Sequence, residues 1–379
     1  MQIKLGDFLR EICIKTVVNN EYPVLTSSKN GIYLQSEYFN KQVASKDNTG
    51  YKIIKKGQFT YRAMSDTGEF YPNMLKCVDI GIVSPAYPVF EITNRDIIYP
   101  QYLQYFFRSN TFRYNISGLE QGSTRTSIKF NKMKNIKIKL PPLLEQKKVI
   151  MILDRVGSLI FKRQEQLKYF DELTKSLFIE MFGDLVKGKY EIKKLKDISK
   201  KISDGIHSKP EYTKTGRPFL SVVNINKGKV NFEDCKYVSE ESFQKMIKST
   251  HPEKGDILYT KVGATYGIAA YIDTNVEFCL YVSVCLIKPK HYLINAKFLS
   301  IQMNMPFIKY QADNRIKGIG VPDLHLNQIR EFDIIVPPLD LQNRFADYVS
   351  SIDKSKLAVK KSLEELEILK KSLMQKYFA

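Results

Sequence analysis

The chain has 379 residues, of which 43% are hydrophobic, and a formal net charge of +19 at pH 7. That length predicts two or three domains, and the basic excess favours a polyanionic partner, nucleic acid or an anionic membrane, over a basic protein without a charged partner. The five cysteines form no C-x-x-C pair, which disfavours a disulfide framework and a zinc knuckle. Without an apolar signal region or a run of about 20 apolar residues, we expect a cytoplasmic protein with no membrane segment.

The first 142 residues predict a mixed α/β region. A short amphipathic helix is expected at its start, where the spacing is carried by Leu5, Phe8, Leu9 and Ile12. A second helix is expected over 102–107, with Pro100 near its first turn. A polar loop with glycine at 121–125 and a strand at 136–140 then lead into Pro141-Pro142.

A long helix is expected next, over 145–182. The segment has no proline, and its only interior glycine is Gly157. Gly183-Asp184 is a typical helix end. At 1.5 Å per residue this helix would run roughly 50–57 Å.

The rest of the chain repeats this layout. A short opening helix is expected at 195–202, apolar runs at 219–223 and 281–287, and a helix at 298–303 with Asn295 as its N-cap. A strand at 332–336 leads into Pro337-Pro338 and a second long helix. An offset of 196 places Leu140-Pro141-Pro142-Leu143 onto Val336-Pro337-Pro338-Leu339, and Gln146 onto Gln342.

The repeat predicts an α+β fold of two mixed α/β regions, 1–142 and 185–338, separated by two long helical segments, 143–184 and 339–379. Both helices approximate a heptad pattern, which favours an antiparallel coiled coil over two helices that each cover their own globular region. We expect the seam, and partner docking along it, at Val156, Ile160, Leu167, Phe170, Leu177, Ile352, Val359, Leu363, Leu366 and Leu373.

The two-copy layout resembles a known family. Each copy ends in a loop with glycine, Pro-Pro-Leu, a nearby glutamine and a long helix, and the second also has Asp204-Gly205-Ile206-His207 and Gly216-Arg217-Pro218-Phe219. This combination is similar to the specificity subunit of type I restriction-modification systems. The first copy lacks the Asp-Gly-x-His loop, a divergence expected of two domains that read different sequences.

The resemblance implies a division of labour among subunits. Each globular region would be a target recognition domain that reads one half of a split double-stranded DNA sequence. The helices would hold the halves apart and dock two methyltransferase subunits, which bind S-adenosylmethionine. A restriction translocase-nuclease subunit that uses ATP and Mg would join for cleavage. This chain itself would hold no cofactor, no metal and no catalytic residue.

Polar loop residues are the best candidates for DNA contacts, because connecting segments more often carry function than patterned ones. In the first region they are Tyr61, Arg62, Ser65, Gln121, Ser123, Thr124 and Arg125. In the second they are His207, Lys209, Lys261, Tyr266, Asn314, Arg315 and Lys317.

The candidates leave alternatives open. Arg125 and Arg315 would bind either guanine or a phosphate, and the phosphate contact is the more common. His207 would read a base or order its own loop. The lysines at 132, 134, 137 and 139 fit a solvated strand edge better than a DNA stripe, because only one of their four counterparts in the second copy, Arg330, is basic.

The sequence has no motif typical of catalysis. We find no Asn-Pro-Pro-aromatic motif, no G-x-x-x-x-G-K-[ST] loop and no metal-ligand spacing among the four histidines. Other functions left open are a helical adaptor without sequence-specific DNA binding, the specificity subunit of a related (type IIB/IIG-like) restriction system and, more remotely, a stand-alone enzyme.

Overall fold

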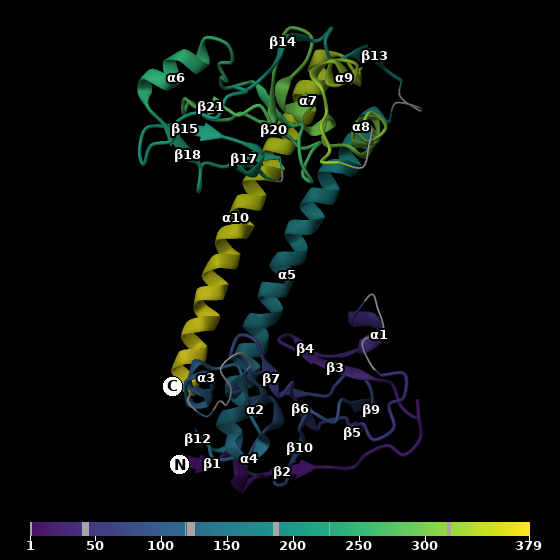
Figure 1. The fold of residues 1–379 in the computed structure, drawn as a ribbon, viewed down its shortest axis with the longest axis vertical. Helices are drawn as coiled ribbons and strands as arrows, with labels where there is room; N and C mark the ends of the chain where they lie inside the picture. Colours follow the sequence, from purple (N-terminus) through teal and green to yellow (C-terminus); the bar gives the residue numbers. More distant parts are fainter. Residues whose placement is uncertain are drawn as a thin grey trace. The chain divides into compact units, whose positions relative to one another are not determined.

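The computed structural model describes residues 2–39, 45–117, 119, 126–184, 189–226, 228–316 and 320–379. These residues form two compact units, 1–164 with 361–379 and 165–360, described separately below. Each unit holds half of each long helix, so a unit boundary falls within α5 and within α10 (Figure 1).

Unit 1 contains one four-stranded antiparallel sheet with the order β2-β10-β6-β8. The short strands β1 and β12 pair separately, with Ile3 opposite Ile138. The elements of this part of the chain are β1 (Gln2–Lys4), η1 (Leu5–Asp7), β2 (Leu9–Ile12), β3 (Leu25–Ser28), β4 (Gly31–Leu34), α1 (Gln35–Tyr38), β5 (Lys52–Lys55), β6 (Phe59–Thr60), β7 (Met64–Ser65), β8 (Asn73–Met74), β9 (Ile80–Val83), β10 (Val89–Ile92), α2 (Pro100–Phe106), α3 (Asn110–Ile116), β11 (Thr126–Ser127), α4 (Phe130–Met133), β12 (Lys137–Lys139) and α5 (Leu143–Phe182).

Unit 2 has an equivalent antiparallel sheet with the order β14-β22-β19-β20. The pair β13 and β23 corresponds to β1 and β12, and Ile192 lies opposite Ile335. The elements here are β13 (Glu191–Lys194), β14 (Ser199–Asp204), β15 (Arg217–Leu220), η2 (Val222–Asn224), β16 (Ile225–Asn226), β17 (Lys229–Val230), β18 (Lys236–Val238), α6 (Glu240–Ile247), β19 (Ile257–Thr260), β20 (Ala269–Tyr271), β21 (Cys279–Leu280), β22 (Val284–Pro289), α7 (Ala296–Gln302), α8 (Pro306–Asp313), α9 (Leu326–Arg330), β23 (Asp333–Val336) and α10 (Leu339–Phe378).

The internal repeat is visible in the element bounds. Helices α2 and α7, and likewise α5 and α10, start and end at positions separated by the same offset of 196 that relates the sequence motifs. The units differ in what joins these shared elements. Unit 1 adds the pairs β3-β4 and β5-β9, whereas unit 2 adds the sheet β18-β15-β21 and helix α6. The predicted two-copy α+β fold is confirmed.

The two expected opening helices are wrong. Only one turn, η1, forms at Leu5–Asp7, and Leu9–Ile12 is strand β2, paired with β10. In the second copy Ser199–Asp204 is strand β14. Eight residues give a helix few internal hydrogen bonds, whereas pairing with a neighbouring strand satisfies backbone groups of Leu9–Ile12 and of Ser199–Asp204. The run at 219–223 is likewise divided, because the strand ends at Leu220 and Val222–Asn224 forms a 3-10 turn.

The glutamine that follows each Pro-Pro-Leu fixes the start of a long helix. Fully buried Gln146 accepts a hydrogen bond from the Tyr99 N–H at 2.8 Å and donates to the carbonyls of Ile97 and Pro141. Gln342 makes the same three bonds, to Asn295, Leu293 and Pro337. One amide side chain therefore ties the last strand, the preceding helix and the long helix together in each unit.

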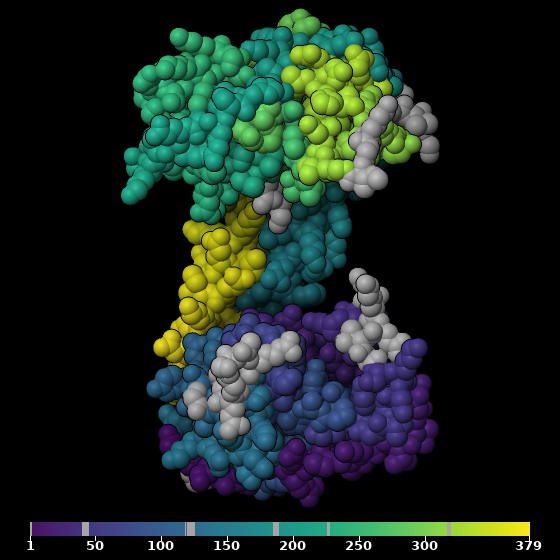
Figure 2. Space-filling model, viewed as in Figure 1, coloured from purple at the N-terminus to yellow at the C-terminus, as the bar shows by residue number. Residues whose placement is uncertain are grey.

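Helices α5 and α10 pack together as an antiparallel coiled coil. In unit 1, Leu153 near the start of α5 lies in the same core as Phe378 at the end of α10. In unit 2, Phe178 near the end of α5 packs on Phe345 near the start of α10. Figure 2 shows their side chains in contact where both helices are visible.

The side chains at the predicted seam positions are all buried or half-buried, while their flanking residues are mostly exposed. Gly183 ends α5 in a left-handed conformation, with φ +74°. The alternative of two independent helices is excluded by this mutual packing.

In the described ranges, the structure has no helix both long and apolar enough to cross a membrane. The five cysteines are free thiols.

Candidate nucleic-acid interface

The Asp-Gly-x-His loop leaves the end of strand β14 and passes close to β21. A Cβ at Gly205 would lie only 2.2 Å from the carbonyl oxygen of Leu280, so no other residue fits without a backbone shift. The next residue, Ile206, donates its N–H to that same carbonyl at 2.9 Å. The glycine therefore allows the loop to pair with the sheet just before His207.

Asp204 anchors the loop from within. Its carboxylate lies 3.5 Å from the ammonium of Lys261, and the two side chains are only 14% and 7% exposed. Thr250 donates its hydroxyl to the Asp204 carbonyl at 2.6 Å, and Lys261 also lies 3.7 Å from Asp323. Burial raises the pKa of the Asp204 carboxyl, and the nearby Lys261 charge opposes that rise. Three separate chain segments thus meet at one buried ion pair.

Lys261 was also predicted to contact DNA, and its position in the structure does not favour that contact. Its side chain is buried, and its ammonium group lies beside two carboxylates inside the unit. The two partners were not predictable, because Asp204 and Asp323 are both remote from Lys261 along the chain.

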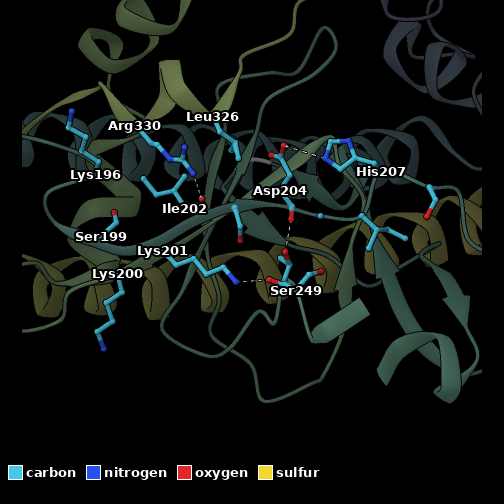
Figure 3. A pocket seen from close by; sticks show the side chains of 15 residues that line it. Lys196, Ser199, Lys200, Lys201, Ile202, Asp204, His207, Ser249, Leu326 and Arg330 are labelled. Carbon is cyan, nitrogen blue, oxygen red and sulfur yellow. Dashed lines mark hydrogen bonds and ion pairs between the residues drawn. The ribbon is translucent and has the colours of Figure 1, made fainter. Parts of the chain in front are cut away.

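His207 lies at the rim of a basic groove of about 1000 Å³ (Figure 3). Its side chain is 79% exposed, and its Nε2 lies 4.0 Å from the Asp204 carboxylate. Four cationic side chains line the same groove, and Asp204 is the only acid among its described lining residues; the four are Lys196, Lys200, Lys201 and Arg330.

The groove cations are held to different degrees. Lys201 donates to the Ser249 carbonyl at 2.6 Å and Arg330 to the Ile202 carbonyl at 3.0 Å, and both of these acceptors are uncharged. Lys196 pairs with Glu331 at 2.6 Å. This arrangement suits an anionic backbone, because fixed donors and excess positive charge face the same hollow.

Two further candidates of unit 2 lie at the surface. Exposed Lys209 lies 6.0 Å above the Tyr212 ring. Exposed Asn314 follows the end of α8, beside Asp313.

Half-buried Tyr266 belongs to a fixed cluster. Its hydroxyl donates to Asp313, and the ammonium of Lys309 lies 3.3 Å from the ring centroid. Lys309 also pairs with Asp313 at 2.5 Å, and its hydrogen bond is the main reason that the pKa of the Asp313 carboxyl is lowered. The cluster presents an ionised carboxylate, which can accept a hydrogen bond from a base amino group.

Arg315 is half-buried and bonds within the unit. Its guanidinium donates to the carbonyls of Gln311 at 2.8 Å and Glu331 at 3.1 Å, and it lies 5.3 Å above the Phe332 ring. These contacts close the end of α8, and a DNA contact by Arg315 stays a prediction.

In unit 1, the side chain of Tyr61 also bonds within the unit, and its burial does not favour the predicted DNA contact. It is fully buried and donates its hydroxyl to the Ile128 carbonyl at 3.1 Å, and burial raises its pKa. Arg62 and Ser65 are better placed. The Arg62 side chain is more than half exposed and lies 4.0 Å from Asp66. Ser65 accepts from the N–H groups of Thr67 and Glu69, which fixes a tight turn.

The five remaining candidates, Gln121, Ser123, Thr124, Arg125 and Lys317, lie outside the described residues. The segments that follow their loops are described. In unit 1, Thr126–Ser127 pairs with Met64–Ser65. In unit 2, Asp323 bridges to Val262. In both copies, the chain that follows this loop therefore pairs with the segment that comes after an inner strand of the four-stranded sheet, β6 in unit 1 and β19 in unit 2.

Comparison with known proteins identifies this duplicated unit. Residues 4–169 and 187–368 each match the family model of the type I restriction modification DNA specificity domain. The chain belongs to this family.

Named relatives agree with the match. The chain is 24% identical over 310 residues to the type I restriction enzyme MjaIX specificity subunit of Methanocaldococcus jannaschii, an alignment that covers 75% of this chain and 69% of that protein. It is 25% identical over 179 residues to the EcoKI specificity subunit of Escherichia coli, covering 44% and 38%.

Two solved structures share the fold. One is a chain from a study of complex assembly and conformational transition of the type I R-M system, with a TM-score of 0.63, 17% identity and coverage of 100% of this chain and 97% of that one. The other is the type I restriction-modification S subunit from M. genitalium, with a TM-score of 0.56, 16% identity and coverage of 100% and 96%.

Several residues of the second specificity domain were missed by sequence reasoning. Lys196, Lys200 and Lys201 belong to a visibly basic run, so their charge was available as a signal. The roles of Lys309 and Asp313 were not, because only folding brings α8 against the segment that carries Tyr266. In the described part of the chain, no group of three or more His, Cys, Asp or Glu side chains could hold a metal ion.

Proposed function

We propose that the chain is the DNA-specificity subunit of a type I restriction-modification system and that each specificity domain reads one half of a bipartite duplex target. The observation that carries the proposal is the family domain present twice, in two units with the same sheet order and the same helix bounds. Two copies that differ in the connections between shared elements suit a reader of two different half-sites.

In unit 2 the DNA-facing surface is proposed to include the rim of the basic groove. Lys200 and Lys201 would attract phosphates, while exposed His207 and Lys209 would reach base edges or the sugar-phosphate backbone. Tyr266, with Asp313, and Asn314 form a second patch with hydrogen-bonding groups for bases. In unit 1 the corresponding candidates are Arg62 and Ser65, and the loop candidates outside the described residues stay predictions.

The chemistry is proposed to belong to partner subunits. Two methyltransferase subunits would supply S-adenosylmethionine and transfer the methyl group, and a translocase-nuclease would supply ATP- and Mg-dependent cleavage. In this proposal the present chain binds and positions, and carries no catalytic residue.

Partner docking is proposed for the outer face of α5 rather than for the seam. The seam side chains of α5 pack against α10, whereas Ile152, Leu159 and Leu173 are 38%, 40% and 50% exposed. They lie on one side of the helix, because their spacings are multiples of seven residues. Exposed apolar side chains that share one side of a helix mark a protein interaction surface.

Selection from random duplex DNA tests the proposal. The chain, assembled with its methyltransferase, should enrich two short sequence blocks at a fixed separation, with affinity that falls as salt rises. Enrichment of one contiguous block would refute the bipartite assignment. Binding without any sequence preference would instead favour the adaptor function.

A further inference from the structure

A second groove, of about 760 Å³, lies in unit 1 between helix α3 and the last turns of α10. Figure 1 shows α3 beside the C-terminal end of α10. Apolar and aromatic side chains form much of its lining, among them Tyr105, Ile160 and Met374. It belongs to a different unit from the basic groove of Figure 3, and none of its lining residues was a DNA-contact candidate.

The rim of this groove is basic. Five cationic side chains line it, namely Lys29, Arg108, Arg113, Lys370 and Lys371, and Glu367 is the only acid among its described lining residues. Three of these cations already have polar partners. Arg108 donates to Asn73 at 2.5 Å, and Glu69 lies 3.4 Å from Arg113 and 3.9 Å from Lys29. Within the described residues, Lys370 and Lys371 have no ion-pair partner.

The elements that line the groove carry exposed apolar side chains. Tyr114, which lines the groove, is 81% exposed, and Phe161 on α5 and Ile368 on α10 are 61% and 69% exposed. An occupant that covers this surface has to be longer than a small ion or metabolite. It also has to present apolar groups to the floor and negative charge to Lys370 and Lys371.

We propose that this groove docks an acidic segment of the methyltransferase subunit, with apolar side chains against Met374 and Tyr114 and carboxylates beside Lys370 and Lys371. The inference rests on the proposed function for the identity of the partner. A DNA duplex fits the surface less well, because it presents a polar, convex backbone and would leave the apolar floor uncovered.

The test measures the affinity of the full-length chain for the purified methyltransferase subunit. The variants are Lys370→Glu with Lys371→Glu, Lys371→Glu alone, and Tyr114→Ala. Lys360→Glu with Lys361→Glu, exposed on the same helix, and Tyr292→Ala, on an equally exposed tyrosine of unit 2, are the matched controls. We expect roughly tenfold weaker binding for the double and tyrosine variants, a smaller loss for Lys371→Glu, and wild-type affinity for both controls.

A second measurement, binding of the assembled complex to its selected DNA, distinguishes a failure of the docking proposal from a failure of the specificity function. We expect the groove variants to keep the wild-type target sequence and unfolding temperature. Methyltransferase affinity unchanged in all three groove variants would overturn the docking proposal, as would a loss confined to DNA affinity. If the wild-type assembly selected no DNA sequence while the groove variants still weakened assembly, the specificity function would fail and the docking site would stand.

Discussion

At the scale of single residues, burial decides which polar side chains are free to meet DNA. Tyr61, Lys261 and Arg315 looked equivalent to Arg62, Lys209 and Asn314 in the sequence, because all six are polar residues in loop-like stretches. Tyr61 and Lys261 are buried and Arg315 is half-buried with its guanidinium bonded to backbone carbonyls, whereas the second three residues are exposed. A sequence pattern cannot separate the two groups, since the buried partners come from distant segments.

Lys261→Met and Lys209→Met should therefore behave differently. Removal of the Lys261 charge leaves the buried Asp204 carboxylate without its nearest cationic partner, and we expect a loss of about 3 kcal/mol in the free energy of unfolding. Lys209→Met should leave stability unchanged and weaken duplex binding. Thermal unfolding and DNA titration of both variants check this, and equal stability of the two would contradict the anchoring role of Lys261.

The same variant has a predictable pH dependence. Burial already raises the pKa of Asp204, and removal of Lys261 raises it further. A carboxyl with a raised pKa in the folded state stabilises the fold when protonated, so this contribution is lost as pH rises through that pKa. The stability difference between wild type and Lys261→Met should accordingly grow from acid to neutral pH in denaturation curves. A difference that shrinks over this range would argue against Asp204 as the affected group.

Two glycines should respond to alanine with opposite signs. Gly205→Ala forces a Cβ onto the Leu280 carbonyl and should destabilise unit 2 by about 1–3 kcal/mol or more. Gly157→Ala lies within α5 with no atom inside 4 Å of the new Cβ, so it should stabilise the helix by about 0.5–1 kcal/mol. Calorimetry on the two variants measures both, and a stable Gly205→Ala variant would show that the loop does not need this close approach.

At the scale of elements, long patterns were predictable and short ones were not. The 40-residue helices α5 and α10 carry a heptad pattern over many turns, and their bounds differ from the prediction by only two residues at the start of α5. The opening segments are too short to distinguish a helical from an extended spacing. Their strand form depends on β10 and β22, which follow far along the chain.

The glutamine after each Pro-Pro-Leu should stabilise the junction between the long helix and the elements that precede it. Gln342→Leu removes three hydrogen bonds from a fully buried site and leaves their backbone partners unsatisfied, which should cost about 3 kcal/mol of unfolding free energy. Gln164→Leu, on an exposed side chain of α5, is the control and should change stability little. Chemical denaturation compares them, and similar midpoints for both would mean that the junction does not depend on Gln342.

Substitutions in the seam of the long helices and on their exposed face should have different effects on stability. Leu167→Asp with Leu363→Asp places charge in the seam and should destabilise the coiled coil along with partner assembly. Leu173→Asp alters the exposed face and should weaken methyltransferase assembly at unchanged thermal stability. Size-exclusion chromatography measures this assembly. Normal binding of the methyltransferase by the Leu173→Asp variant would contradict the outer-face assignment.

At the scale of the whole molecule, the internal repeat carried the most information. One offset of 196 relates the motifs and the helix bounds, and the specificity-domain model matches the chain twice, so the fold class and the family followed from the sequence. The residues proposed to contact bases did not follow in the same way. We expect them where the two copies differ, and a repeat is uninformative where its copies diverge.

If this chain determines which DNA sequence its system modifies, the methylated motif in a host should depend on the chain, and methylome sequencing measures that dependence. A host that expresses the chain with its methyltransferase is compared with the same host after deletion of the chain. We predict one split, adenine-methylated motif that disappears on deletion. A variant with His207→Ala and Lys209→Ala should weaken or alter recognition of only one half of that motif. A methylome that stays the same after deletion would contradict the specificity function and favour an adaptor.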